Sequence, residues 1–333
     1  MRYCLYIFAL FFPYGCLQAQ STIALTGITD TSYNLNSEYR KNSKSFPFIR
    51  PAIRSYPATV RVDSNVVYCT RTGKELLLDV FYPAAASSGL RKTIILIHGG
   101  GWRSGNRQLH HPMAERLATM GYVCITPSYR LSTEALFPAA IQDVKASVKW
   151  TRIHAATYKI DTAAIAIAGH SAGGQLAALV GATNSTRFFL DEDCYPNASP
   201  NLYAVIDMDG ILAFLHRESG EGDDTKRISA ATYWFGYSKT EKPELWNQAS
   251  ALTHAGPHMP PMLFMNSMVD RMHAGQSDLI RILDQYKIPS TVRVYKGAPH
   301  SWLLFHPWLD STVNDIDRFM RRTFRHHPIK KGK

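Results

Sequence analysis

The sequence lacks the features that mark several other classes of protein. Its 333 residues contain no run of the roughly 18 apolar residues that a membrane-spanning helix requires, so we expect no membrane span. Repeats at solenoid periods and low-complexity tracts are absent, which argues against solenoid and disordered architectures. No CxxC, HExxH or acidic calcium-binding loop occurs, so the sequence predicts no metal and no cofactor. An Arg-rich helix and interleaved basic and aromatic residues are also missing, and we expect no nucleic-acid partner.

Cysteines are few, and three of them lie beyond the N-terminal segment. Cys124 lies in an apolar run and is expected to be a buried core thiol. Cys69 and Cys194 could pair in an oxidising compartment, although three scattered cysteines form no disulfide framework.

Residues 1–20 have the pattern of a secretory signal peptide. Arg2 gives a positive start, Cys4–Phe12 is apolar, and small residues offer a cleavage site near Ala19. We therefore expect export, to the periplasm or outside the cell. A lipoprotein signal modified at Cys16 is the alternative.

The formal net charge of +11 concerns partners rather than fold. It suits an anionic substrate such as a galacturonan, but it is equally compatible with a basic surface that has no specific partner.

Hydrophobic patterning predicts an N-terminal extension over 21–58 and an α/β catalytic domain over 59–333. Strands alternate with helices, which indicates a mostly parallel sheet covered by helices on both faces. Residues 211–258 lose the alternation and are expected to form an insertion or cap before the acid-bearing strand. The expected strands are Val60–Val67, Leu76–Phe81, Thr93–Ile97, Tyr122–Thr126, Ala163–Ala168, Tyr203–Met208, Pro261–Asn266 and Thr291–Tyr295.

A nucleophile elbow is the strongest motif in the chain. Gly169-His170-Ser171-Ala172-Gly173 has the form G-x-S-x-G and lies between an expected strand and an expected helix. The turn leaves no room for larger neighbours, which exposes a serine hydroxyl at the edge of the sheet. Ser171 is therefore the predicted nucleophile.

An oxyanion hole is predicted from a second glycine-rich segment, His98-Gly99-Gly100-Gly101-Trp102, which follows another expected strand. Acyl transfer requires N–H donors that are already aimed at the developing oxyanion. We assign this role to the N–H groups of Gly100 or Gly101 together with Ala172. His98 is expected to orient the loop.

A serine nucleophile needs a base and an orienting acid, which in this kind of fold follow the serine in the order acid, then histidine. His300 follows the last expected strand and is the predicted base, with His306 and His273 as rivals. Asp270 follows the preceding expected strand and is the predicted acid, with Asp278 as the alternative.

These motifs together resemble the α/β-hydrolase esterases of the hormone-sensitive-lipase-like and carbohydrate-esterase kind, over about residues 60–325. The HGGGW block, the segment from Phe137 to Val144 and GHSAGG occur in that family in the same order. The resemblance implies that Asp143 is structural. The family commonly has His-Gly before the acid, where this chain has Asn266-Ser267.

Segments near the C-terminus are similar to secreted bacterial pectin esterases, which act on methyl or acetyl esters. The segments run from Arg271 to Gly275 and from Pro299 to Trp308. Arg103 and Arg271 are candidates for binding a galacturonate carboxylate, although Arg271 could equally pair with an acid for structure. Trp102 and Trp302 are candidates for stacking on sugar rings, unless they are core aromatics.

The leading prediction is a secreted serine carboxylesterase acting on plant cell-wall polysaccharide, with pectin as the first candidate. A xylan acetyl or feruloyl esterase and a general short-chain esterase or lipase are the alternatives. A serine peptidase and a non-catalytic binding protein are the more remote ones.

Overall fold

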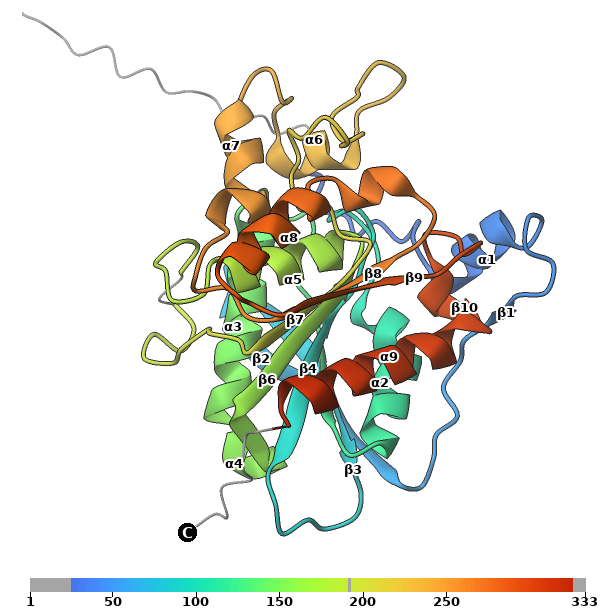
Figure 1. Cartoon of the computed structure of the whole chain (residues 1–333), viewed down its shortest axis with the longest axis vertical. Coiled ribbons are helices and arrows are strands. Elements are labelled where there is room, and N and C mark those ends of the chain that lie inside the picture. Colours follow the sequence, from blue (N-terminus) through green and yellow to red (C-terminus); the bar gives the residue numbers. More distant parts are fainter. Residues whose placement is uncertain (1–24, 191–192, 326–333) are drawn as a thin grey trace, which may run out of the picture.

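The computed structural model describes residues 25–190 and 193–325, so the expected signal peptide at 1–20 lies outside the described residues. The centre of the molecule is an eight-stranded sheet with the strand order β2-β3-β5-β4-β6-β7-β8-β9 (Figure 1). β2, β3 and β5 pair antiparallel, and all remaining pairs are parallel. This confirms the expected α/β fold with a mostly parallel sheet. The strands are β2 (Val60–Arg71), β3 (Lys74–Pro83), β4 (Arg91–Ile97), β5 (Val123–Pro127), β6 (Ile160–His170), β7 (Ala204–Met208), β8 (Met262–Asn266) and β9 (Ser290–Val294).

Helices cover both faces of this sheet. α3, α5 and α8 lie on one face, and α2 and α9 lie on the other (Figure 1). Side chains of the first group pack into one apolar core, and those of the second group pack into another. The central strands β4 and β7 are buried along most or all of their length, which explains their continuous apolar sequence. The helices are α2 (His111–Thr119), α3 (Ala139–Ile153), α4 (Ala155–Tyr158), α5 (Ala172–Ala182), α8 (Gln276–Gln285) and α9 (Trp308–Thr323).

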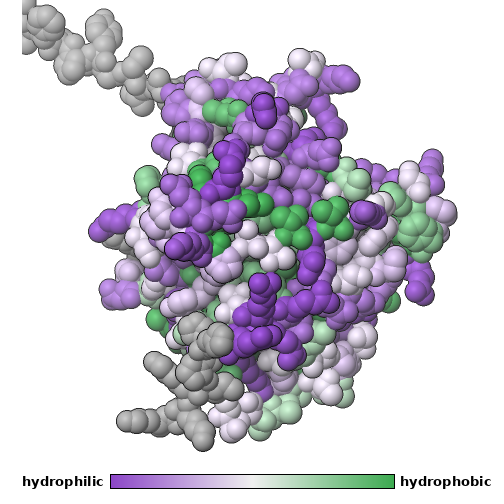
Figure 2. All heavy atoms as spheres, in the orientation of Figure 1, coloured by the Kyte–Doolittle hydropathy of each residue, from purple (hydrophilic) through white to green (hydrophobic). Residues whose placement is uncertain are grey.

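The surface of the molecule reflects this layering. Figure 2 shows hydrophobic residues in the middle of one face, over β9, and hydrophilic residues over α9. β9 is an edge strand on which Val292 and Val294 are exposed. α9 buries Leu309, Val313 and Ile316 and presents polar residues outward, as an amphipathic helix does.

Residues 25–58 cross the surface of the α/β unit. They include α1 (Leu35–Asn42) and β1 (Arg50–Pro51), and β1 pairs antiparallel with β10 (Phe305–His306). Further upstream, Asp30 forms a β-bridge with Ser104.

The cysteines lie as their positions suggested. Cys69 and Cys194 form a disulfide that ties β2 to the segment after α5, with their Cα atoms 6.0 Å apart. Cys124 is a fully buried free thiol in β5. Burial raises the pKa of this thiol, so it is a core residue and not a reactive one.

Residues 211–258 contain the short helices α6 (Ala230–Phe235) and α7 (Pro243–Gln248), which lie above α5 in Figure 1. Trp234 in α6 stacks on Trp102 with ring centroids 4.7 Å apart. The backbone N–H of Phe137 donates to the carbonyl of Trp234. These contacts hold the segment against the glycine-rich loop after β4 and against the residues before α3.

Candidate active site

Ser171 lies on a strained turn between β6 and α5. Its φ of 56° and ψ of −121° lie outside the regions that side-chain-bearing residues favour. The turn is possible because glycines flank it: a Cβ on Gly169 would come within 2.0 Å of the Gly173 carbonyl oxygen, and one on Gly173 within 2.1 Å of the Ile97 oxygen. The spacing of the G-x-S-x-G motif is therefore dictated by backbone contact on both sides of the serine.

A small cavity of about 150 Å³ opens at this turn. Ser171 and His300 both line it, although they are far apart in the sequence. The remaining lining residues are Gly101, Trp102, Ala172, Ile211, Glu221, Ala230, Arg271 and Met272. The cavity therefore brings together the predicted nucleophile, the predicted base and two of the three predicted oxyanion donors.

The N–H groups at the cavity are suited to an oxyanion. Ala172 begins α5, and the first N–H groups of a helix have no acceptor within the helix. Among the described residues, no hydrogen bond uses the N–H of Gly100 or Gly101. Gly100 has a φ of 123°, and a Cβ there would lie 2.1 Å from the Ser104 oxygen, so only glycine fits.

His98 is the first residue after β4 and contacts the backbone of the glycine-rich loop. This histidine is buried, its Nδ1 lies 2.9 Å from the Gly99 oxygen, and its ring stacks on Tyr129 at 4.4 Å. Burial lowers the pKa of His98 to about 4, so its imidazole is neutral at pH 7. His98 thus contacts the loop that it was expected to orient.

His300 is paired with Asp209 and not with Asp270, the acid that the sequence predicted. His300 Nδ1 lies 2.8 Å from Asp209 Oδ2, and the Asp209 side chain is fully buried. Asp209 follows β7, one strand closer to Ser171 in the sheet than the strand before Asp270. His300 is also fixed by its backbone, because its carbonyl oxygen lies 2.8 Å from His170 Nε2.

Other groups converge on the same carboxylate. The Ser267 N–H donates to Asp209 Oδ1 at 2.7 Å, the Ser267 hydroxyl donates to Oδ2, and His273 Nε2 lies 3.0 Å from Oδ1. Burial raises the pKa of Asp209, but the hydrogen bonds from His273, His300 and Ser267 outweigh this effect. They hold the pKa well below its usual range, so Asp209 is ionised at pH 7.

Asp270 itself lies elsewhere. Its side chain is exposed, makes no hydrogen bond or ion pair with the described residues, and lines a separate hollow with Glu218 and His273. The alternative, Asp278, lies in the first turn of α8 and pairs with Arg281 and His216. Neither carboxylate contacts His300.

The sequence carried two signals for Asp209. Asp209-Gly210 directly follows a buried, mostly apolar strand that neighbours the strand before Ser171. In addition, Asn266-Ser267 replaces the His-Gly that commonly precedes the acid in the resembling family. Ser267 now has a clear role, because both of its donors bind Asp209.

The predicted substrate-binding residues are only partly brought to the cavity. Trp302 is fully buried, donates to Thr312 Oγ1 at 3.0 Å and stacks on Tyr295, so it is a core aromatic. Trp102 lines the cavity, but its ring is buried against Trp234 and its Nε1 donates to Gln175. Neither ring offers an open face to a sugar.

The two predicted arginines differ. Arg103 does not line the cavity: it pairs with Asp30 at 3.4 Å and lies over the Tyr233 ring. Arg271 does line the cavity, and its guanidinium contacts Glu221 at 2.8 Å. The ion pair joins the segment after β8 to the 211–258 segment at the cavity.

Asp143 has the structural role that the resemblance implied. It is buried in α3, where its carboxylate accepts hydrogen bonds from the backbone N–H and guanidinium of Arg130, at 2.9 Å and 2.8 Å. Within 25–190 and 193–325 there is no group of three or more His, Cys, Asp or Glu side chains placed to hold a metal. Over the same residues, no helix has the length and apolar character needed to cross a membrane.

The strand order, the turn at Ser171 and the helices on both faces define an α/β-hydrolase fold. The chain belongs to the BD-FAE family, whose model matches residues 78–281. Among solved structures it is similar to a truncated carbohydrate esterase from gut microbiota, with a TM-score of 0.67 and 20% identity over 82% of this chain and 99% of the other. The apo form of Thermogutta terrifontis esterase 2 gives 0.65 and 22%, over 81% and 97% of the two chains.

Relatives in sequence are described as esterases or deacetylases. The probable carboxylic ester hydrolase LipM of Mycobacterium tuberculosis is 28% identical over 206 residues, which cover 60% of this chain and 46% of LipM. Bovine (Bos taurus) arylacetamide deacetylase is 33% identical over 136 residues, 38% of this chain and 33% of the relative. The chain thus spans about half or less of the length of these relatives.

Proposed function

We propose that this protein is a serine carboxylester hydrolase that uses Ser171, His300 and Asp209. The observation that carries the proposal is the shared cavity, which Ser171 and His300 both line, while His300 is hydrogen-bonded to a buried, ionised Asp209. Ser171 attacks the ester carbonyl, His300 accepts its proton, and Asp209 orients the imidazole. The Gly101 and Ala172 N–H groups donate hydrogen bonds to the oxyanion. The protonated His300 then gives its proton to the departing alcohol, which leaves an acyl ester on Ser171. Water activated by His300 hydrolyses that ester, which releases the acid and restores the Ser171 hydroxyl.

The size of the cavity supports a short acyl group. A volume of about 150 Å³, bounded in part by Ile211, Met272 and Trp102, suits an acetyl group better than a feruloyl arm. We therefore propose acetyl esters as the preferred substrates. The carbohydrate esterase among the similar structures supports a carbohydrate ester as the substrate, and acetylated pectin and acetylated xylan are our candidates.

A pectin methyl ester is the second candidate, because Arg271 lines the cavity. In that reaction galacturonate itself is the acyl group, and a neighbouring carboxylate would have to draw Arg271 away from Glu221. The competing ion pair makes this substrate the less favoured one.

Product analysis tests these choices. Acetate released from acetylated pectin or acetylated xylan supports the proposal, whereas methanol alone from methylated pectin would favour the methylesterase. Ser171→Ala should lower hydrolysis by at least about 10⁴-fold in every assay without loss of fold. Failure of the wild-type protein to react with a fluorophosphonate would contradict a serine hydrolase of any kind.

Export to an oxidising compartment is a further part of the proposal. The Cys69–Cys194 disulfide supports it, because such bonds persist mainly outside the cytosol. N-terminal sequencing of protein recovered from cell fractions and medium tests it. A mature chain that begins near Gln20 is expected, and a cytosolic chain that retains Met1 or Arg2 would contradict it.

A further inference from the structure

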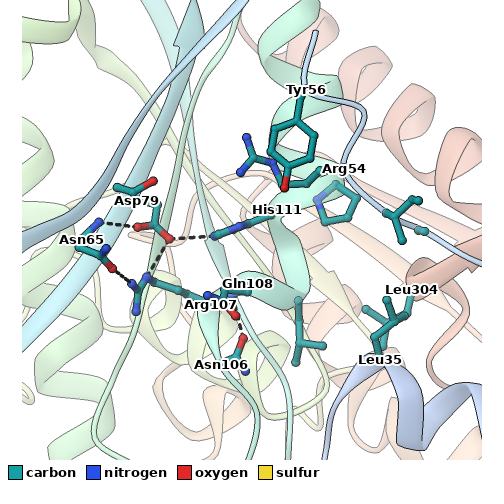
Figure 3. A pocket seen from close by; sticks show the side chains of 15 residues that line it. Leu35, Arg54, Tyr56, Asn65, Asp79, Asn106, Arg107, Gln108, His111 and Leu304 are labelled. Atoms are coloured by element: carbon teal, nitrogen blue, oxygen red, sulfur yellow. Dashed lines mark hydrogen bonds and ion pairs between the residues drawn. The ribbon is translucent and has the colours of Figure 1, made fainter.

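A second cavity, of about 740 Å³, shares no lining residue with the cavity at Ser171. It lies between residues 35–56 of the N-terminal segment, strands β2 and β3, and the start of α2 (Figure 3). None of the proposed catalytic groups lines this cavity.

The floor of this cavity is a polar network centred on the buried Asp79 in β3 (Figure 3). Asp79 Oδ2 accepts from Arg107 Nε at 2.7 Å and lies 2.8 Å from His111 Nε2. Its other oxygen accepts from the backbone N–H of Asn65 at 2.7 Å. Burial raises the pKa of Asp79, but these hydrogen bonds outweigh it and lower the pKa below its usual value, so Arg107 faces an ionised partner.

One rim of the cavity is a strained loop that carries an aromatic ring. Tyr56 has a φ of 51° and is 72% exposed, with the Arg54 guanidinium 4.2 Å from its ring centroid. A tyrosine in the left-handed region is unfavourable unless its surroundings impose it.

The constraint on this loop comes from Glu115, a buried residue of α2. Its Oε1 accepts from the backbone N–H groups of Ser55 and Tyr56 at 2.6 Å and 3.1 Å, and its Oε2 accepts from Arg54 Nε at 3.0 Å. A buried carboxylate thus fixes the backbone that carries an exposed aromatic ring, which reduces the entropy lost when a ligand binds.

Amides complete the lining on the opposite side. Asn106 and Gln108 are exposed residues in the segment that leads into α2. The Asn106 side-chain oxygen accepts from the Gln108 backbone N–H at 3.0 Å, which fixes the direction of its amide. Side-chain amides both donate and accept, so they match the hydroxyl groups of a sugar.

Charge in this cavity is balanced. Arg107 is paired with Asp79, and Arg54 is paired with Glu115. An anionic ligand would have to compete with both carboxylates, whereas an uncharged ligand with many hydroxyl groups would disturb neither pair.

We propose that the 740 Å³ cavity is a second binding site, which takes an uncharged saccharide segment. Tyr56 provides a ring against which a sugar packs, and Asn106 and Gln108 bind its hydroxyl groups. The site holds a polysaccharide chain on the enzyme at a place separate from the ester under attack. The choice of a saccharide as ligand rests on the proposed function.

Direct binding tests this proposal without catalysis. Ser171→Ala protein is titrated by calorimetry with xylohexaose, cellohexaose and mannohexaose, and with hexagalacturonate as the anionic counterpart. At least one neutral oligosaccharide is expected to bind, and Tyr56→Ala in the same background to weaken it about 5- to 10-fold. Asn106→Ala with Gln108→Ala should also weaken binding. Tyr286→Ala, which alters an exposed tyrosine at the end of α8, is the matched control and should bind as the parent does.

Three outcomes would overturn the proposal: no binding of any neutral oligosaccharide, unchanged affinity in Tyr56→Ala, or binding of hexagalacturonate alone. Hydrolysis of a small aryl acetate by the Tyr56→Ala enzyme with Ser171 intact should equal that of wild type, since Tyr56 lies outside the catalytic cavity. If wild type cleaves no ester but Tyr56-dependent binding is found, the esterase proposal fails and the binding site stands.

Discussion

Two aspartates follow neighbouring strands of the sheet, and their surroundings differ completely. Asp209, after β7, is buried and accepts hydrogen bonds from Ser267 and from the imidazoles of His273 and His300. Asp270, after β8, is exposed and makes no hydrogen bond or ion pair with the described residues. Both positions lie at the edge of the sheet where α/β enzymes place their chemistry. Burial and converging donors therefore distinguish the carboxylate that pairs with His300, and the order of strands along the chain does not reveal either property.

Ser267 accounts for part of the difference between Asp209 and Asp270. With its N–H and hydroxyl both directed at Asp209, this residue links the end of β8 to the acid at the end of β7. A residue that follows β8 thus helps to hold Asp209, which follows β7.

Of the substitutions at Asp209, Ser267 and Asp270, Asp209→Asn should have the largest effect. An asparagine preserves the shape but removes the charge that orients and stabilises the imidazolium, so we expect kcat for an aryl acetate to fall about 10⁴-fold. Steady-state kinetics measures the effect, and circular dichroism confirms the fold. A loss below tenfold would show that His300 does not depend on this carboxylate.

Asp209 and Asp270 should also differ in how they affect stability as the pH falls. Because the folded-state pKa of Asp209 is lowered, its interactions stabilise the protein above the unfolded-state pKa of about 3.9. That stabilisation diminishes as the pH falls from about 4 through the folded-state pKa. Urea unfolding should therefore show Asp209→Asn to be less stable than wild type at pH 5, with the difference narrowing toward pH 3.

Asp270→Asn is the control for that titration and should follow the wild-type stability profile. If the difference in unfolding free energy between wild type and Asp209→Asn widened toward pH 3, the lowered pKa of Asp209 would be contradicted.

Ser267→Ala tests the donors that hold the acid. Loss of a hydroxyl bonded to a buried carboxylate should lower the free energy of unfolding by about 1.5–3 kcal/mol, as measured in urea at pH 7. Ser277→Ala is a matched control, because Ser277 is an exposed serine at the start of α8. Equal effects of the two substitutions would argue against a special role for Ser267.

Asp270→Asn should have the smallest effect of the series. An exposed side chain without partners contributes little, so kcat/KM for an aryl acetate should remain within about twofold of wild type. A drop comparable to that of Asp209→Asn would restore Asp270 as the acid.

Some parts of this architecture are local enough to be predicted from the sequence. Ser171 is marked by glycines that must be adjacent for steric reasons, and the buried strands by continuous apolar runs. Cys124 is likewise predictable, because it lies inside such a run.

Other features depend on contacts between distant segments, and these were missed. The pairing of His300 with Asp209 joins residues 91 positions apart. The sequence predicts Trp302 as a candidate for stacking on a sugar ring. In the fold its ring is buried, where it stacks on Tyr295 and donates to Thr312 of α9. Arg103 follows the glycine-rich loop yet points to Asp30, a residue of the N-terminal segment that no local pattern connects to it.

The most direct test of the acid is the low-field proton NMR spectrum of the protein. A strong hydrogen bond from a protonated His300 Nδ1 to Asp209 should give a resonance shifted far downfield. Recording it in His273→Gln protein removes the second imidazole that contacts this carboxylate. We predict that the resonance persists when Asp270→Asn is added and disappears when Asp209→Asn is added. The reverse pattern would contradict the assignment of Asp209 as the acid.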